Sequence, residues 1–307
     1  MLKRKDLLGL KDVSRDEIEE ILAVAAQMRK VLERNEKKTT HLQGKSVITL
    51  FYENSTRTRT SFETAAKIMS AATTSISVAT SSVQKGETLI DTGKNLDAIC
   101  ADAIIIRHSM SGAPHLLAKN VRASVINGGD GLNEHPTQAL LDLYTMKERF
   151  GSFEGLKVVI AGDIKHSRVA RSNIWGLNTL GAKVTVCAPK TLLPAEIEQM
   201  GVTVSNNLDE CIRGANVVMG LRMQLERQQA GLVPSLAEYH AYYGINAKRL
   251  TLADGDAIVM HPGPVNRGVE MSSEVVDGEQ SVILPQVTNG VAVRMALLAL
   301  LLGREDR

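Results

Sequence analysis

Hydroxyl and guanidinium side chains are concentrated in one short segment that directly follows an apolar run. It reads STRTR and consists of Ser55, Thr56, Arg57, Thr58 and Arg59, with a helical pattern behind it. The start of a helix offers free backbone N–H groups and the positive end of the helix dipole, which together bind anions. The segment therefore predicts an anion site that only one of the two arginines faces, because they lie two residues apart. A plain helix cap with solvated arginines is the alternative.

The absence of two glycine-rich motifs indicates what kind of anion this segment binds. There is no GxxxxGK[ST] loop, and no GxGxxG sequence opens a helix. These are the glycine-rich patterns that hold nucleotide and dinucleotide phosphates. Their absence favours a small phosphate compound over a nucleotide as the ligand.

More polar side chains follow other predicted strands in the first half of the chain. Arg107 ends a strand expected at 103–108, where it could reach the same anion or form a surface salt bridge. His135 precedes a helix expected at 136–150, a position that favours a neutral imidazole able to donate to a carbonyl oxygen. A capping role is the alternative for His135. Gln138 adds an amide one turn later.

The polar segment 81–87 is a possible phosphate-contacting loop, because Lys85 lies beside Gly86. Loops of this composition are more often merely solvated. In the second half of the chain, Arg168 lies near a helix start, and Arg222 and Gln224 follow a strand. Two arginines from two strand ends suit a dicarboxylate, although single arginines at such places are more often surface residues.

The sequence His-Pro-Gly-Pro at 261–264 ends another predicted strand. Pro262 and Pro264 have no N–H group, so the backbone there is stiff and exposes carbonyl acceptors. An X–Pro peptide bond in such a loop can be cis.

Two series of alternating strands and helices are expected to position these residues. Strands are predicted at 46–52, 74–79, 103–108 and 123–128, and then at 156–163, 182–189, 202–205, 215–220 and 257–263. Alternation of this kind predicts parallel sheets covered by helices on both faces. We expect two doubly wound α/β domains joined by long helices, with a C-terminal helix at 290–302 returning to the first domain. In such sheets ligands bind at the carboxyl ends of the strands.

Composition limits the class of protein. The 307 residues predict about two domains, and the net charge is only +2 with 3% aromatic residues. Both values disfavour a nucleic-acid binder. Three widely spaced cysteines without a CxxC pair argue against a zinc site or a disulfide framework. The longest apolar run, 295–302, is short for a membrane span, and no apolar run follows the basic N-terminus. We expect a soluble cytoplasmic protein without membrane contact.

Taken together, these motifs resemble the aspartate/ornithine carbamoyltransferase family. The matching segments are FYENSTRTRTSFE (51–63), SSVQKGETLIDT (81–92), IIRH (105–108), DGLNEHPTQALLDLYT (130–145), GDIKHSRVARSN (162–173), residues 222–227 and MHPGPVNRGVE (260–270). Ornithine enzymes usually carry HPCQ where this chain has HPTQ, and a His-Cys-Leu-Pro motif where it has HPGP. The chain thus resembles the aspartate branch, and Gly263 departs from the leucine that is common in the family.

The resemblance implies transfer of the carbamoyl group from carbamoyl phosphate to L-aspartate in pyrimidine synthesis, without a cofactor or metal. It implies a carbamoyl phosphate-binding domain of residues 1–137 and 288–307 and an aspartate-binding domain of residues 138–287. Catalytic roles fall to Arg57, Thr58, Lys85, Arg107 and His135. Carbamoyl phosphate would be bound by Ser55, Thr56, Arg57, Thr58, Ser81, Lys85, Arg107, His135, Gln138, Pro262, Gly263 and Pro264. Aspartate would be bound by Lys85, Arg168, Arg222 and Gln224.

The resemblance also implies a homotrimer in which Ser81 and Lys85 enter the neighbouring subunit's site. Regulatory chains or a dihydroorotase are possible further partners. A carbamoyltransferase acting on ornithine or a related amine is one alternative, disfavoured by the basic Arg222 region. A catalytically silent assembly subunit is another, and it should have lost some of the arginine, lysine and histidine positions that are all present here.

Overall fold

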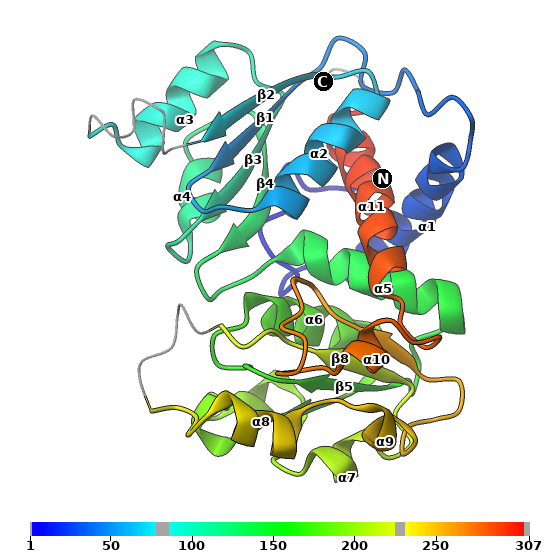
Figure 1. Cartoon of the computed structure of the whole chain (residues 1–307). Coiled ribbons are helices and arrows are strands. Elements are labelled where there is room, and N and C mark those ends of the chain that lie inside the picture. The colour runs from blue at the N-terminus through cyan, green and yellow to red at the C-terminus, as the bar shows by residue number, and fades with distance from the viewer. Residues whose placement is uncertain (1, 78–85, 225–230, 304–307) are drawn as a thin grey trace. The chain divides into compact units, whose positions relative to one another are not determined.

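The computed structural model describes residues 2–77, 86–224 and 231–303 (Figure 1). The chain divides into two compact units, one of residues 1–144 and 288–307 and the other of residues 145–287. The boundaries pass through two long helices, α5 (Pro136–Phe150) and α11 (Ile283–Leu302). The first unit therefore extends to Tyr144 and includes the start of α5, whereas the resemblance places the end of this domain at residue 137.

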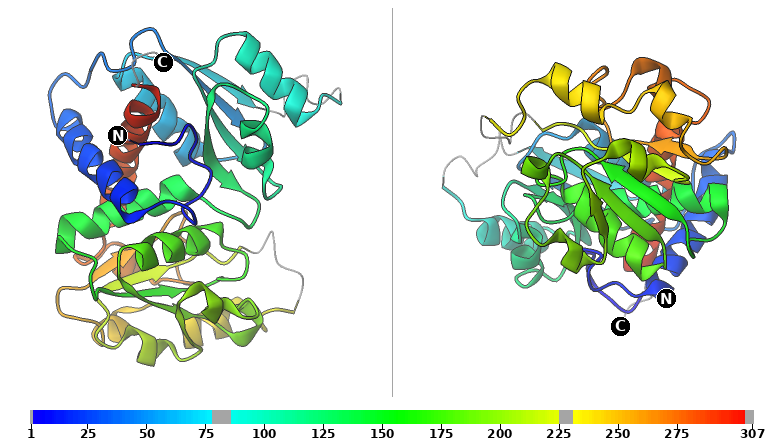
Figure 2. Two further views of the ribbon diagram at one scale, coloured as in Figure 1. Left: turned by 180° about the vertical axis from the view of Figure 1, so that it is seen from behind. Right: turned by 90° about the horizontal axis from the view of Figure 1, so that it is seen from below.

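The first unit is built on a four-stranded parallel sheet with the order β2-β1-β3-β4. Helices α3 and α4 lie on one face, and α1, α2 and α11 lie on the other (Figures 1 and 2). The remaining bounds are α1 (Arg15–Leu32), β1 (Ser46–Phe51), α2 (Thr56–Ile68), β2 (Ala72–Ser77), α3 (Leu89–Ala98), β3 (Ala103–His108), α4 (Ala113–Ala118) and β4 (Ser124–Asp130).

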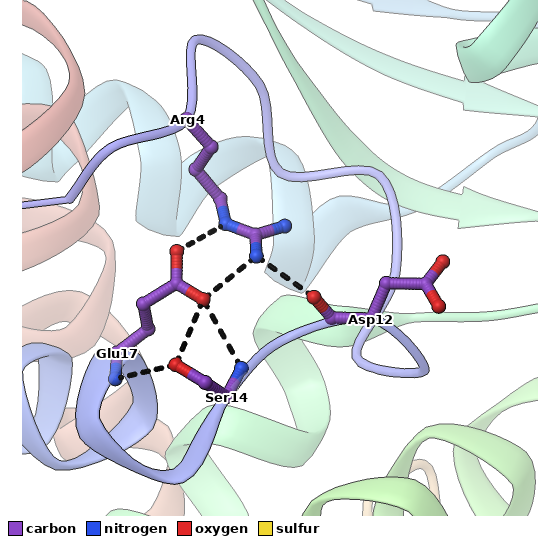
Figure 3. A network of polar contacts seen from close by, with 4 residues as sticks. All are labelled: Arg4, Asp12, Ser14 and Glu17. Carbon is purple, nitrogen blue, oxygen red and sulfur yellow. Dashed lines mark hydrogen bonds and ion pairs between the residues drawn. The ribbon is translucent and has the colours of Figure 1, made fainter.

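Helix α1 begins at a capping box, in which Ser14 and Glu17 bond each other's backbone N–H groups. Figure 3 shows Arg4 extending this motif: its guanidinium donates to both Glu17 carboxylate oxygens at 2.8 Å and to the Asp12 carbonyl at 2.9 Å. The N-terminal segment is thereby fixed to the start of α1.

The second unit holds a five-stranded parallel sheet with the order β7-β6-β5-β8-β9. Side chains of β5 pack on one face into a core with α7, α9 and α10, and α6 lies on the other face. The bounds are β5 (Lys157–Ala161), α6 (Arg168–Thr179), β6 (Lys183–Cys187), the 3-10 turns η3 (Lys190–Leu192) and η4 (Ile197–Met200), β7 (Thr203–Ser205), α7 (Leu208–Ile212), β8 (Val217–Gly220), α8 (Leu236–Tyr243), α9 (Ala247–Leu250), β9 (Ile258–Met260) and α10 (Ser273–Val276).

The predicted fold class is confirmed: both sheets are parallel and doubly wound, and α11 returns to the first unit. Helix α11 begins at Ile283, seven residues before the predicted start. Pro285 is compatible with this earlier start, because it lies in the first turn of the helix, where proline is tolerated. By length and composition α11 could cross a membrane, but more than half of its apolar window is buried inside the chain. That burial is typical of a core helix.

Candidate active site

The predicted anion site lies at the start of α2, in the first unit. Ser55 is the N-cap residue, yet its hydroxyl makes no capping hydrogen bond. The plain capping interpretation of this segment is therefore weakened. Thr56 and Arg57 are exposed, whereas the Arg59 guanidinium lies 5.1 Å from the centre of the Phe51 ring. Of the two arginines, Arg59 packs on the fold and Arg57 is exposed.

The topology of the first sheet places its switch point beside this helix start. The chain winds outward from β1 to β2 on one side and from β3 to β4 on the other. The loops that follow β1 and β3 therefore diverge at a topological switch point, where ligands of such sheets bind. Arg107 at the end of β3 pairs in register with Phe51 at the end of β1. Segment 55–59 and Arg107 thus meet at the same edge.

Arg107 is held by two groups of its own unit. Its Nε lies 3.4 Å from Glu53 Oε2, and its Nη1 donates to the Gly128 carbonyl at 3.3 Å. Both side chains of the ion pair are more than three-quarters shielded from solvent. The guanidinium is thereby oriented before any ligand binds. The sequence did not predict Glu53 as the partner of Arg107.

A buried carboxylate shapes the loop that leads to His135. Asp130 is fully buried and accepts hydrogen bonds from the Gly112 and Glu134 backbone N–H groups and from the Asn127 amide. Gly131 has a φ of 46°, and a Cβ there would lie 2.7 Å from a backbone nitrogen, so only glycine fits.

This loop brings His135 to α2. His135 is 4% exposed and its Nε2 lies 3.5 Å from Thr58 Oγ1, which is also buried. Gln138 lies in the first turn of α5 and donates from Nε2 to Asp142 Oδ1 at 3.0 Å. The structure therefore brings Thr58 and His135 together and gives the Gln138 amide a fixed partner.

Asp163 organises the corresponding edge of the second sheet. Its Oδ1 accepts from the His166 backbone N–H at 3.2 Å and lies 2.8 Å from His166 Nδ1, and its Oδ2 accepts from the Gln224 N–H at 3.4 Å. Gln224 Nε2 donates to the His166 carbonyl at 3.1 Å. One fully buried carboxylate thus joins the loop after β5 to the loop after β8, at the switch point of this sheet.

Two of the predicted aspartate ligands lie on these joined loops beside Gln224. Arg168 is the first residue of α6, where Ser167 caps the helix by accepting from the Ala170 N–H at 3.1 Å. Arg222 follows β8. The two loops approach so closely that a Cβ on Gly162 would lie 2.5 Å from the Leu221 carbonyl oxygen. Gly162 is required for that approach.

The loop after β9 is fixed by His261, which is 2% exposed. Its Nδ1 accepts from the Gly263 N–H at 2.8 Å, and its Nε2 lies 3.3 Å from Glu270 Oε1. Gly263 has a φ of 67°, in the left-handed region, and the Gly263–Pro264 bond is cis. The order β5-β8-β9 places Pro262 and Gly263 beside the loop that carries Arg222.

Some predicted residues cannot be placed. Ser81, Lys85 and Arg227 lie outside the described residues. Sequence reasoning also missed Asp130 and Asp163, whose only signal was a carboxylate at the end of an apolar strand run. Across residues 2–77, 86–224 and 231–303, no group of three or more His, Cys, Asp or Glu side chains could hold a metal ion.

Two family models match nearly all of the chain. The carbamoyl-P binding domain of aspartate/ornithine carbamoyltransferases matches residues 5–148, and the Asp/Orn binding domain matches residues 154–301. This chain belongs to the aspartate/ornithine carbamoyltransferase family. Membership makes it a carbamoyltransferase. The first compact unit corresponds to the first family domain and the second unit to the second, except that residues 288–301 of α11 match the second family model but belong to the first unit.

Individual carbamoyltransferases separate the branches of the family. The aspartate carbamoyltransferase catalytic subunit of Ruminiclostridium cellulolyticum is 65% identical over 99% of this chain and 97% of its own length. Aspartate transcarbamoylase from Trypanosoma cruzi, in complex with carbamoyl aspartate and phosphate, has a TM-score of 0.87 at 32% identity, covering 97% of this chain and 96% of its own. Ornithine carbamoyltransferase from Pyrococcus furiosus also has a TM-score of 0.87, at 30% identity and 98% coverage of both chains. The fold is thus shared by both branches, and sequence identity favours the aspartate branch.

Proposed function

We propose that this chain transfers the carbamoyl group of carbamoyl phosphate to the amino group of L-aspartate, giving N-carbamoyl-L-aspartate and phosphate. This is the committed step of de novo pyrimidine synthesis. The observation that carries the proposal is the 65% identity, over 99% of the chain, to a relative named aspartate carbamoyltransferase catalytic subunit. In this proposal the first unit binds carbamoyl phosphate and the second binds aspartate.

The phosphate group binds at the start of α2. Its charge is met by backbone N–H groups of the first turn, by the helix dipole and by the cationic side chains at this edge. The exposed Arg57 and the Ser55 hydroxyl, which makes no capping hydrogen bond, support this placement. The phosphate ligands are Ser55, Thr56, Arg57, Thr58 and Arg107, joined by Ser81 and Lys85 of the 78–85 segment.

The carbamoyl oxygen lies against Thr58, Arg107 and His135. The aspartate nitrogen attacks the carbamoyl carbon, a C–N bond forms, and the carbonyl oxygen becomes an oxyanion. Hydrogen-bond donors that already point at that oxygen stabilise its negative charge without having to move during the reaction. Each such donor lowers the activation free energy by about 3–4 kcal/mol. The 3.5 Å approach of Thr58 to His135 and the held guanidinium of Arg107 support this arrangement.

The carbamoyl NH2 group donates to three acceptors. These are the Gln138 side-chain oxygen and the backbone carbonyls of Pro262 and Gly263, with Pro264 stiffening the loop. The hydrogen bond from the Gly263 N–H to His261 Nδ1 fixes the loop that carries these carbonyls. The planar carbamoyl group is thereby oriented for attack on one face.

Aspartate is held through its two carboxylates. Arg168 and Arg222 bind them, with Lys85 and Gln224 as further donors, because guanidinium groups pair with carboxylates in two parallel hydrogen bonds. The C–O bond to phosphate then breaks, and the departing phosphate takes the proton that the amine loses. No side chain acts as a general base, so catalysis rests on positioning and electrostatics.

The working assembly is a homotrimer that shares its sites, in which Ser81 and Lys85 serve the neighbouring subunit. A mixing experiment tests this. Lys85→Ala and Arg57→Ala chains, each nearly inactive alone, are dissociated, mixed and reassociated. Shared sites would return activity, since some sites receive both intact residues. Hybrid trimers without activity would refute the sharing.

Location and further partners complete the proposal. We place the enzyme in the cytoplasm, consistent with three free cysteines. It acts without cofactor, nucleic acid or membrane. Regulatory chains or a dihydroorotase remain possible binding partners of the trimer.

The reaction is tested by measuring kcat/KM with carbamoyl phosphate and either aspartate or ornithine. We expect turnover with aspartate and at most a trace with ornithine, because the acceptor set is basic and suits a dicarboxylate. Faster turnover with ornithine would overturn the assignment, and no turnover with either acceptor would favour a silent assembly subunit.

A further inference from the structure

A buried carboxylate lies directly behind Gln138. Asp142 is 0% exposed and lies one helical turn after Gln138 on α5. It accepts the hydrogen bond from Gln138 Nε2 at 3.0 Å. An ionised carboxylate only accepts hydrogen bonds, so it selects the NH2 end of the glutamine amide and turns the Oε1 end away from itself. A buried carboxylate thus holds the NH2 end of this amide.

Arg294 on α11 supplies the opposite charge. It is 3% exposed, and Asp142 is the group whose charge acts on it. Burial lowers the pKa of Arg294 to about 10, so the guanidinium is still charged at neutral pH. Its Nε has no hydrogen-bond partner within the described part of the chain. A buried cation of this kind is costly unless a counter-charge is close, and the Asp142 carboxylate is the counter-charge that acts on it.

Two neighbouring residues, Gly290 and Phe62, make room for and contact the Arg294 guanidinium. Gly290 lies one turn earlier on α11, and a Cβ there would lie 2.5 Å from Arg294 Nη1. The guanidinium is 5.1 Å from the centre of the Phe62 ring, a cation–π contact. Phe62 is fully buried on α2, one turn after Thr58. Arg294 thus contacts the same face of α2 from which Thr58 approaches His135.

We propose that Asp142 and Arg294 are positioning residues for carbamoyl transfer: they hold the Gln138 amide so that its oxygen accepts a hydrogen bond from the carbamoyl NH2 group. This inference rests on the proposed function, since it takes Gln138 as a carbamoyl ligand. Neither residue needs to touch the substrate. Their effect passes through the Gln138 amide.

The competing interpretation is a buried charge pair that only stabilises the first unit. Removing one member of such a pair leaves an uncompensated charge and destabilises a protein, whereas replacing both by neutral groups of similar size is often tolerated. The single Asp142→Asn variant and the double Asp142→Asn/Arg294→Met variant therefore separate folding from catalysis. In both, the amide at position 142 can present either its oxygen or its NH2 group to Gln138, so the fixed orientation is lost.

The experiment measures kcat/KM for carbamoyl phosphate in the trimeric enzyme, the inhibition constant of inorganic phosphate, and the melting temperature. For the folded double variant we expect kcat/KM to fall about tenfold, the value of one misdirected hydrogen bond. Phosphate inhibition should stay unchanged, because phosphate does not contact the Gln138 amide. In a Gln138→Ala background the same double substitution should have no further effect on kcat/KM.

Three outcomes would overturn the inference while leaving the proposed function intact. One is a folded double variant with wild-type kcat/KM. Another is an equal loss of carbamoyl phosphate and phosphate binding, which indicates general damage to the unit. The third is a further tenfold loss in the Gln138→Ala background, which shows that Asp142 and Arg294 do not act through Gln138. Failure of the wild-type chain to carbamoylate aspartate would instead refute the proposed function.

Discussion

Thr58 Oγ1 lies 3.5 Å from His135 Nε2, and both side chains are almost completely buried. The two residues are 77 positions apart and are brought together by the first turn of α2 and the loop before α5. A hydroxyl and an imidazole that meet at the switch point of a parallel sheet can both donate to one oxygen atom. This pair is the part of the site that most resembles an oxyanion-binding arrangement.

Replacing His135 tests that role. We expect His135→Ala to lower kcat by roughly 10²- to 10³-fold while the fold is retained, because a donor to the developing oxyanion is lost. His41→Ala is the matched control, since His41 is exposed in the loop between α1 and β1. Steady-state kinetics and melting curves of both variants provide the measurement. A kcat equal to that of the control would return His135 to a capping role.

Arg222 tests the acceptor site. We expect Arg222→Ala to raise the KM for aspartate by roughly 10- to 100-fold, since a charge-assisted hydrogen bond to a carboxylate is lost. The KM for carbamoyl phosphate should change little. Arg213→Ala, which removes an exposed arginine of the same unit, is the control. An aspartate KM equal to that of the control variant would show that Arg222 does not bind the aspartate carboxylate.

A pair of cysteines in the second unit predicts a reactive thiol. A hydrogen bond from Cys187 lowers the pKa of Cys211 to about 7, while the same interaction raises that of the buried Cys187. In a Cys100→Ser background, the rate of alkylation of Cys211 by iodoacetamide should rise with pH around a midpoint near 7. Cys187→Ala removes the donor and should move the midpoint upward. An unchanged midpoint would contradict this.

The capping box of α1 predicts a pH-dependent contribution to stability. Hydrogen bonds from Arg4 lower the pKa of Glu17 from 4.5 to about 2. A lowered pKa in the folded state stabilises the fold above the unfolded value of 4.5, and this contribution is lost as the pH falls towards 2. The melting temperature of wild type should therefore exceed that of Glu17→Gln at pH 6, and the gap should narrow at pH 3. The exposed Glu36→Gln variant should show no such gap, and a constant gap for Glu17→Gln would refute the prediction.

The regular elements were predictable where local signals agreed. Strand β3 was predicted at its observed bounds because an uninterrupted apolar run ends at Arg107. Helix α5 ends as predicted before Gly151, which has a φ of 73°. The short helices α9 and α10 have four residues each and carry too weak a periodic pattern to be seen in the sequence.

The supports of the site were not predictable, because they join residues that are far apart in the sequence. Gln224 and Asp163 are 61 positions apart, and nothing local indicates their hydrogen bond. The same holds for the charge of Asp142 acting on Arg294, which lies 152 positions later in the chain. Motifs identified which side chains could contact a substrate, whereas only the folded chain reveals which groups hold them.

Isotope labelling of the reaction tests the central claim most directly. The enzyme is given ¹³C-labelled carbamoyl phosphate with equal concentrations of ¹⁵N-labelled aspartate and ¹⁵N-labelled ornithine, and the products are followed by NMR. Attack of the aspartate nitrogen on the carbamoyl carbon predicts a one-bond ¹³C–¹⁵N coupling in N-carbamoyl-L-aspartate, with release of inorganic phosphate. Coupling that appears in the ornithine product instead, or labelled carbon that is released without coupling to either acceptor, would contradict the account.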